Sequence, residues 1–232
     1  MGESTSNHSQ DLVQTNSNQC YIGKNRLEKA IDVYKKAVPN GEADTFTVTW
    51  HPFYLDPSLP KKGVEPEVHM ANKFGADRAK TMTARLRQMG ASEGLPFKGR
   101  GNIGNTRDAH RLLQLAKRTS PEMQNKVVAQ LFQSHFEEGL DITSTEMLVD
   151  SAAKAGLDRA EAQKWLDEGK GGDEVDREVQ EAYAKGVHGV PNFTVNGKYV
   201  LEGAQDPQTF LQAFVRAKAE APEVSSESAG TC

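Results

Sequence analysis

Thiol chemistry in this chain depends on Cys20 and Cys232, the two cysteines of a 232-residue sequence, which stand near its opposite ends. Cysteines so far apart exclude a disulfide-stapled framework and a zinc site built from cysteines. A lone buried thiol is more often an inert part of a core than a catalyst. Cys232 stands in a polar tail without an evident partner, and we expect it to be a free, exposed thiol.

A second candidate is the proline of the stretch Gly189-Val190-Pro191-Asn192-Phe193. Proline cannot donate to a sheet ladder, so this position belongs at the first residue of a strand or at an edge. Two interpretations follow from the pentapeptide alone. One is an ordinary trans turn proline, and the other is a cis proline that exposes the backbone of Val190 to a ligand.

The histidines do not have the spacing of a metal site. His51 precedes a proline, His110 lies between charged residues, and His188 stands three positions before Pro191. No His-x-x-x-His pair and no paired-carboxylate spacing accompanies them. We therefore expect no metal and no tightly bound cofactor.

The net charge and the distribution of apolar residues exclude several classes of protein. The 28 Lys and Arg residues against 32 Asp and Glu residues give a net charge of −4, which excludes a general polyanion binder. No apolar run approaches the roughly 20 residues that span a membrane. The N-terminus lacks the basic start and apolar stretch of a secretory signal. We expect a cytoplasmic protein without nucleic-acid or membrane partners, and its oligomeric state stays open.

Periodic apolar residues predict the elements that must position these candidates. Leu27, Ala30, Ile31 and Tyr34 form a helical stripe, and residues 45–50 alternate as a strand. A block of about five or six helices follows, and Asn196-Gly197 between two short apolar runs predicts a β-hairpin ahead of a last helix. The order predicts an α/β protein with a small sheet and a helical insertion. It matches the C-terminal half of a thioredoxin fold, which favours a cis Pro191.

Several separated motifs resemble the FrnE-like branch of the DsbA family. The first is Cys20-Tyr21-Ile22-Gly23-Lys24, continued by Arg26-Leu27-Glu28, and the second is Trp50-His51-Pro52-Phe53-Tyr54. The others are Asn105-Thr106-Arg107-Asp108, Phe136-Glu137-Glu138-Gly139, Gly189-Val190-Pro191 and Gly203-Ala204-Gln205. The resemblance covers about residues 20–216 and implies a thioredoxin fold with an inserted all-helical subdomain.

Family members place Cys-Pro-Trp-Cys where a strand meets a helix. The first thiol sits at the helix N-terminus, where the dipole lowers its pKa, and the second resolves the mixed disulfide. In this chain Cys20 corresponds to the second cysteine, and Ser17 stands at the position of the first. Asn18 and Gln19 replace Pro-Trp. A hydroxyl cannot form a disulfide, so the resemblance implies a family member whose dithiol cycle is impaired.

Residues 1–19 depart furthest from the family pattern. Only Leu12 and Val13 are aliphatic there, whereas a central parallel strand is normally a Val/Ile-rich run. We therefore expect the first strand to be missing or degenerate, and residues 1–19 to be disordered or to derive from an incorrectly assigned exon. The expected domains are a thioredoxin-like domain over 20–61 and 187–216, a helical insertion over 62–186, and a disordered tail over 217–232.

The function implied is that of a DsbA-like thiol–disulfide oxidoreductase, impaired at Ser17. Two alternatives stay open: a kappa-class glutathione transferase or 2-hydroxychromene-2-carboxylate isomerase that uses Ser17, with glutathione as co-substrate, and a non-catalytic binding protein. The candidate catalytic residues are Ser17, Cys20 and Pro191. The candidate substrate-binding residues are Val190, His51 and His188. The expected partner is a small molecule or peptide that carries a thiol or disulfide.

Overall fold

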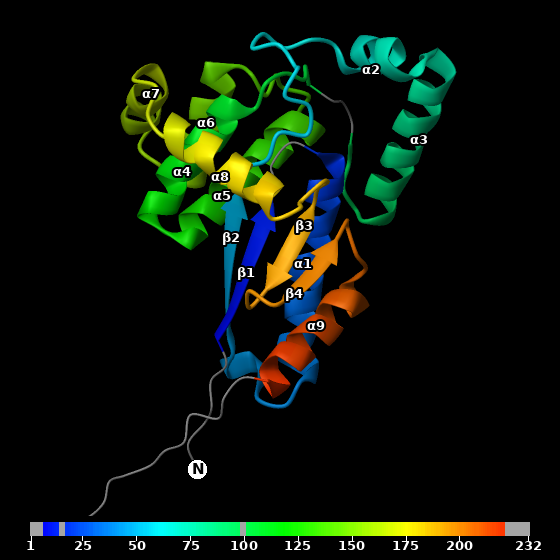
Figure 1. The fold of residues 1–232 in the computed structure, drawn as a ribbon, viewed down its shortest axis with the longest axis vertical. Coiled ribbons are helices and arrows are strands. Elements are labelled where there is room, and N and C mark those ends of the chain that lie inside the picture. The colour runs from blue at the N-terminus through cyan, green and yellow to red at the C-terminus, as the bar shows by residue number, and fades with distance from the viewer. Residues whose placement is uncertain (1–6, 14–16, 98–100, 221–232) are drawn as a thin grey trace, which may run out of the picture.

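A four-stranded mixed sheet lies at the centre of the computed structural model, which describes residues 7–13, 17–97 and 101–220 (Figure 1). Its strands are β1 (Asn7–Val13), β2 (Thr45–His51), β3 (Asn192–Val195) and β4 (Tyr199–Glu202). They lie in the order β2-β1-β3-β4, with β1 parallel to β2 and antiparallel to β3. The helices are α1 (Asn18–Ala37), α2 (Pro66–Phe74), α3 (Ala76–Ser92), α4 (Arg107–Thr119), α5 (Pro121–Phe132), α6 (Thr145–Ala155), α7 (Arg159–Asp167), α8 (Gly172–Ala184) and α9 (Pro207–Ala219). None of these helices is long and apolar enough to cross a membrane.

The expectation that residues 1–19 contribute no strand is wrong. Asn7–Val13 forms β1 at the centre of the sheet, where Leu12 pairs with Trp50 on one side and with Phe193 on the other. Backbone hydrogen bonds to two neighbouring strands hold this segment, and they do not depend on an apolar sequence. The first residues of α1 also fall in this range, whereas residues 1–6 and 14–16 lie outside the described part of the chain.

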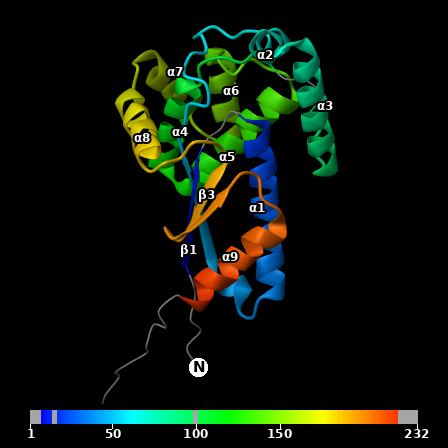
Figure 2. The same ribbon diagram turned by 45° about the vertical axis from the view of Figure 1, so that its right-hand side comes forward.

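The predicted hairpin is confirmed. Strands β3 and β4 pair in antiparallel register, and Asn196 and Gly197 at the turn have φ angles of 49° and 67°. The N–H of Lys198 donates to the Val195 carbonyl at 3.0 Å, and positive φ at both central positions of this turn matches the right-handed twist of the strands. Helix α9 follows the hairpin and packs beside α1, as both views of the ribbon show (Figures 1 and 2).

Helices α2 to α8 are inserted between β2 and β3. Helix α5 covers the edge strand β2 with two amides. The Gln124 Oε1 accepts from the Trp50 N–H and its Nε2 donates to the Trp50 carbonyl, both at 2.9 Å. Asn125 donates to the Val48 carbonyl at 2.8 Å. These side chains satisfy backbone groups that an edge strand otherwise leaves unpaired.

Helices α2 and α3 form a hairpin that stands beside the N-terminal end of α1 (Figure 2). Their buried residues are Pro66, Ala79 and Gly90. A network at Glu93 holds the end of α3 to α1, since this carboxylate accepts from Arg26 at 2.6 Å and from Lys29 at 2.8 Å. So little burial leaves space between this hairpin and the start of α1.

Candidate functional site

Helix α1 begins at a serine that caps it. Ser17 has an extended backbone, and its Oγ accepts a hydrogen bond from the N–H of Gln19 at 3.1 Å. The Ser17 carbonyl accepts from the N–H groups of Cys20 and Tyr21 at 2.9 and 3.1 Å. Serine favours this position because its oxygen satisfies an N–H that the first helical turn leaves unpaired. The positive end of the helix dipole and the Ser17 hydroxyl therefore lie together.

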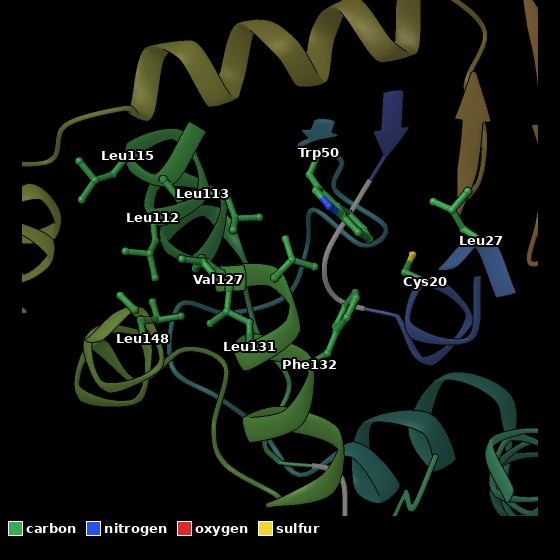
Figure 3. Close-up of a cluster of buried hydrophobic side chains, with 14 of the residues drawn as sticks. Cys20, Leu27, Trp50, Leu112, Leu113, Leu115, Val127, Leu131, Phe132 and Leu148 are labelled. Atoms are coloured by element: carbon green, nitrogen blue, oxygen red, sulfur yellow. The ribbon is translucent and has the colours of Figure 1, made fainter. Parts of the chain in front are cut away.

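The Cys20 thiol, in the first turn of α1, faces the interior. Figure 3 shows its sulfur among Trp50, Phe132 and Leu27, and the residue is fully buried. Burial raises the pKa of the Cys20 thiol above its ordinary range, and hydrogen bonds with the side chain and backbone of Ser17 offset only part of the effect. A thiol that stays protonated and shielded from solvent is a poor nucleophile. Cys20 is a free cysteine, and Cys232 lies outside the described residues.

The loop before β3 packs against the first turns of α1. The peptide bond between Val190 and Pro191 is cis, and the Pro191 carbonyl accepts from the N–H of Gly203 at 2.8 Å. Gly23 permits the close approach, because a Cβ there would lie 3.1 Å from the Pro191 ring and 2.8 Å from the ring of Phe193. Val190 is half-buried against Phe53 and Ala182. The structure thus brings Pro191 next to α1, as the thioredoxin order predicts.

His51 and His188, the two histidines proposed as substrate contacts, do not lie at the start of α1 among the residues around Ser17. The Nδ1 of His51 lies 2.9 Å from the carboxylate of Glu178 on α8, and Gln114 donates to the same carboxylate. Burial raises the pKa of Glu178, but the His51 contact and the charge of Lys117 outweigh it and leave the pKa at about 2. His188 is exposed between α8 and β3. Neither histidine lines the cavity at Ser17, and the described residues contain no cluster of potential metal ligands.

A cavity of about 790 Å³ opens at the start of α1. Ser17, Asn18 and Gln19 form one part of its lining, and residues of the α2–α3 hairpin form another. The remaining lining comes from the loops after β2 and before α4, at residues 54–59 and 103–106. This volume lies within the range of about 300–1,000 Å³ that is typical of small-molecule sites.

Most of this cavity lies outside the residues proposed from the sequence. Its wall includes Met82, Leu86 and Met89, whose i, i+4, i+7 spacing is the signal that could have pointed to this helix face. Charged residues at its mouth include Asp56, whose carboxylate lies 2.5 Å from the ammonium group of Lys73. The hydrogen bond from Lys73 lowers the pKa of Asp56 to about 2. A hydroxyl at a helix N-terminus, opening into an apolar cavity, can hold a thiolate by donating a hydrogen bond.

Comparison with known proteins shows which family the chain belongs to. The model of the DSBA-like thioredoxin domain matches residues 14–215. The chain belongs to this family. The match ends within α9, and it includes both Ser17 and the Pro191 loop.

Several solved structures are similar in fold over more than nine-tenths of this chain. A probable DsbA oxidoreductase from Streptomyces coelicolor is 30% identical, with a TM-score of 0.81 over 97% of this chain and 96% of that one. A 2-hydroxychromene-2-carboxylate isomerase is 16% identical, with a TM-score of 0.67 over 94% of this chain and 100% of that one. The cytosolic disulfide reductase DsbM from Pseudomonas aeruginosa, solved with GSH, is 16% identical, with a TM-score of 0.58 over 91% and 98%. The last two similarities concern the fold alone. No curated protein matches the chain significantly.

Proposed function

We propose that this DsbA-like protein is an FrnE-like member of the family in which dithiol–disulfide exchange is impaired, and that its site binds a thiol at Ser17. The observation that carries the proposal is the chemistry at the start of α1. A hydroxyl occupies the N-cap and lines the cavity, while Cys20, the cysteine within the described residues, is fully buried.

Thiol–disulfide exchange needs an attacking thiolate and a second thiol that releases the mixed disulfide. Ser17 cannot supply the first, because an alcohol neither ionises near neutral pH nor forms a disulfide. Cys20 cannot replace it readily, since burial raises its thiol pKa. The site therefore keeps the dipole and the cavity of an exchange enzyme without its nucleophile.

Insulin reduction with glutathione as the electron donor tests this proposal. We expect no turnover above the uncatalysed rate for the unmodified chain, and the same result for Cys20→Ala. Turnover by the unmodified chain that Cys20→Ala abolishes would contradict the proposal, because it would make Cys20 a working monothiol.

A glutathione-dependent transferase or isomerase of the kappa type is the second candidate. The position of the Ser17 hydroxyl favours it, because a hydroxyl that lines the cavity can donate to the thiolate of a bound glutathione. The fold similarity to a 2-hydroxychromene-2-carboxylate isomerase and to a reductase solved with GSH adds support. Since the cytoplasm keeps glutathione largely reduced, we place this chemistry there.

Thermal unfolding in the presence of glutathione tests whether the site binds this thiol, which the kappa-type candidate requires. A ligand at about 100 times its Kd stabilises the folded state by about 2.7 kcal/mol, which raises the Tm of a chain of this size by about 5–10 °C. We expect this shift for the unmodified chain and a much smaller one for Ser17→Ala. S-methylglutathione, which lacks the thiol, is the matched control ligand. Equal shifts with both ligands, or in both proteins, would count against a thiol contact at Ser17.

A further inference from the structure

The part of the cavity wall that α2 and α3 supply has the composition of a site for an apolar molecule. Helices α2 and α3 contribute Met70, Met82, Leu86 and Met89, and the loop after β2 adds Leu59. Methionine side chains are flexible and polarizable, so they adapt to ligands of different shape. A polar tripeptide such as glutathione gains little from this wall, which therefore fits a second, apolar molecule.

The wall can adjust to its ligand. A smaller cavity of about 230 Å³ lies beside the first, and Asn18, Met70 and Leu86 line both. The α2–α3 hairpin buries few residues against the rest of the protein. Because Met70 lines both cavities, a change in its rotamer would alter the shape of both.

The side chains that line the main cavity carry more positive than negative charge. Lys73 and His69 both lie against Asp56, at 2.5 and 3.8 Å, and Asp56 is the carboxylate that lines the cavity. Arg85 on α3 lines it too, and within the described part of the chain this guanidinium has no hydrogen bond or ion pair with another residue. The N-terminus of α1, which also lines the cavity, adds positive partial charge. The field inside the cavity therefore favours an anion.

We propose that the cavity binds a small amphipathic organic anion, whose apolar body lies against the methionines and whose carboxylate or sulfonate group pairs with Arg85. Arginine suits this role because its planar guanidinium forms two parallel hydrogen bonds to such groups. The inference rests on the proposed function in one respect: it makes this anion the partner of the thiol held at Ser17. Binding of the anion itself does not require the thiol.

A fluorescence titration with 8-anilinonaphthalene-1-sulfonate, an aromatic anion, tests the proposal. The neutral probe N-phenyl-1-naphthylamine is the matched ligand. Arg85→Met should raise the Kd of the anion by about tenfold and leave the Kd of the neutral probe within about twofold. Lys80→Met is the control, because Lys80 is exposed on the same helix and does not line the cavity. It should leave both constants within about twofold.

Met82→Glu supplies a second variant that places a carboxylate on the cavity wall. It should abolish binding of the anionic probe while the neutral probe still binds, and an unchanged Tm shows that the variant folds. Equal effects of Arg85→Met and Lys80→Met would overturn the proposal, because the probe would then respond to general surface charge. Tight anion binding by Met82→Glu would overturn it as well, because the probe would then bind elsewhere.

The same proteins separate this inference from the proposed function. Ser17→Ala should remove stabilisation by glutathione and leave anion binding unchanged. If glutathione fails to stabilise the unmodified chain while the anion still depends on Arg85, the thiol site is wrong and the anion site stands. If glutathione stabilises the chain but Arg85→Met has no effect on the Kd of the anion, the anion site is wrong and the thiol site stands.

Discussion

Replacing Ser17 by cysteine should restore part of the dithiol chemistry. The substitution recreates a pair of thiols with two residues between them at the start of α1, the second of them the buried Cys20. It also removes the serine oxygen that accepts from the Gln19 N–H at 3.1 Å. Loss of an N-cap costs about 1 kcal/mol, which lowers the Tm of a chain of this size by about 2–4 °C.

The restored reactivity comes from the position of the new thiol at the helix N-terminus. A free cysteine with a pKa near 8.5 is about 3% thiolate at pH 7, whereas thiols at helix N-termini have pKa values of about 3.5–7.5. A pKa of about 7.5 already gives about 24% thiolate, an eightfold increase in the reactive form. Burial raises the pKa of Cys20, so it stays a thiol until a mixed disulfide forms beside it. The pair therefore has one attacking and one resolving cysteine.

Alkylation by iodoacetamide as a function of pH measures the new pKa, and insulin reduction measures turnover. Both assays use a Cys232→Ser background, which removes the other cysteine of the chain. We expect Ser17→Cys to be alkylated with an apparent pKa below about 8 and to reduce insulin, at a rate limited by the absence of Pro-Trp. Adding Cys20→Ala should keep the alkylation and abolish turnover. An apparent pKa near 8.5, or no turnover, would refute the argument that the start of α1 is preserved as an exchange site.

Three further substitutions test the structure around the site. Gly23→Ala should destabilise the protein by about 1–3 kcal/mol in urea unfolding, because the added Cβ lies 2.8 Å from the buried Phe193 ring, and this crowding exceeds the roughly 1 kcal/mol that alanine gains in a helix; a more stable variant would show that the ring can move. Gln124→Met should cost about 2–4 kcal/mol, because it leaves the N–H and carbonyl of Trp50 buried without partners, and a cost under about 0.5 kcal/mol would contradict that pairing. Glu178 has a pKa of about 2, below its ordinary value near 4.3, so its contribution is present above about pH 5 and is lost as the pH falls toward 2. Glu178→Gln should therefore reduce the loss in free energy of unfolding between about pH 5 and pH 2 by about 1–2 kcal/mol, after allowance for solvent screening. An unchanged loss would argue against the ion pair.

The elements with strong local signals could be predicted from the sequence. Asn196-Gly197 specifies a turn that few other dipeptides adopt, and the hairpin lies where it was expected. Ser120 caps α5 ahead of a proline, and its Oγ accepts from the N–H of Met123 at 3.0 Å. Such signals depend on neighbouring residues alone, so they do not require knowledge of the tertiary structure.

Strand β1 could not be predicted because its signal is not local. Its sequence, Asn-His-Ser-Gln-Asp-Leu-Val, lacks the apolar run of a buried strand, and only its pairing with β2 and β3 places it in the sheet. Helices α2 and α3 bury only Pro66, Ala79 and Gly90, because their larger apolar residues Met70, Met82, Leu86 and Met89 line the cavity and are not part of the core.

The candidate site was predictable where the family resemblance covers it. Ser17, Cys20 and Pro191 were placed by motifs, and the structure puts all three at or beside the start of α1. The cavity was not predictable, because its lining comes from four separate segments and much of it belongs to the α2–α3 hairpin. His51 was proposed from its position at a strand end, yet its partner Glu178 lies far along the chain on α8.

The central claim is that Ser17 holds and activates a thiol that the protein itself does not supply. The pKa of the glutathione thiol when bound to the protein tests it most directly, and the ultraviolet absorbance of the thiolate as a function of pH measures that pKa. We predict a bound pKa clearly below that of a free thiol, near 8.5, for the unmodified chain, and a value close to that of the free thiol for Ser17→Ala. An unshifted pKa in the unmodified chain, or an equal shift in Ser17→Ala, would contradict the account.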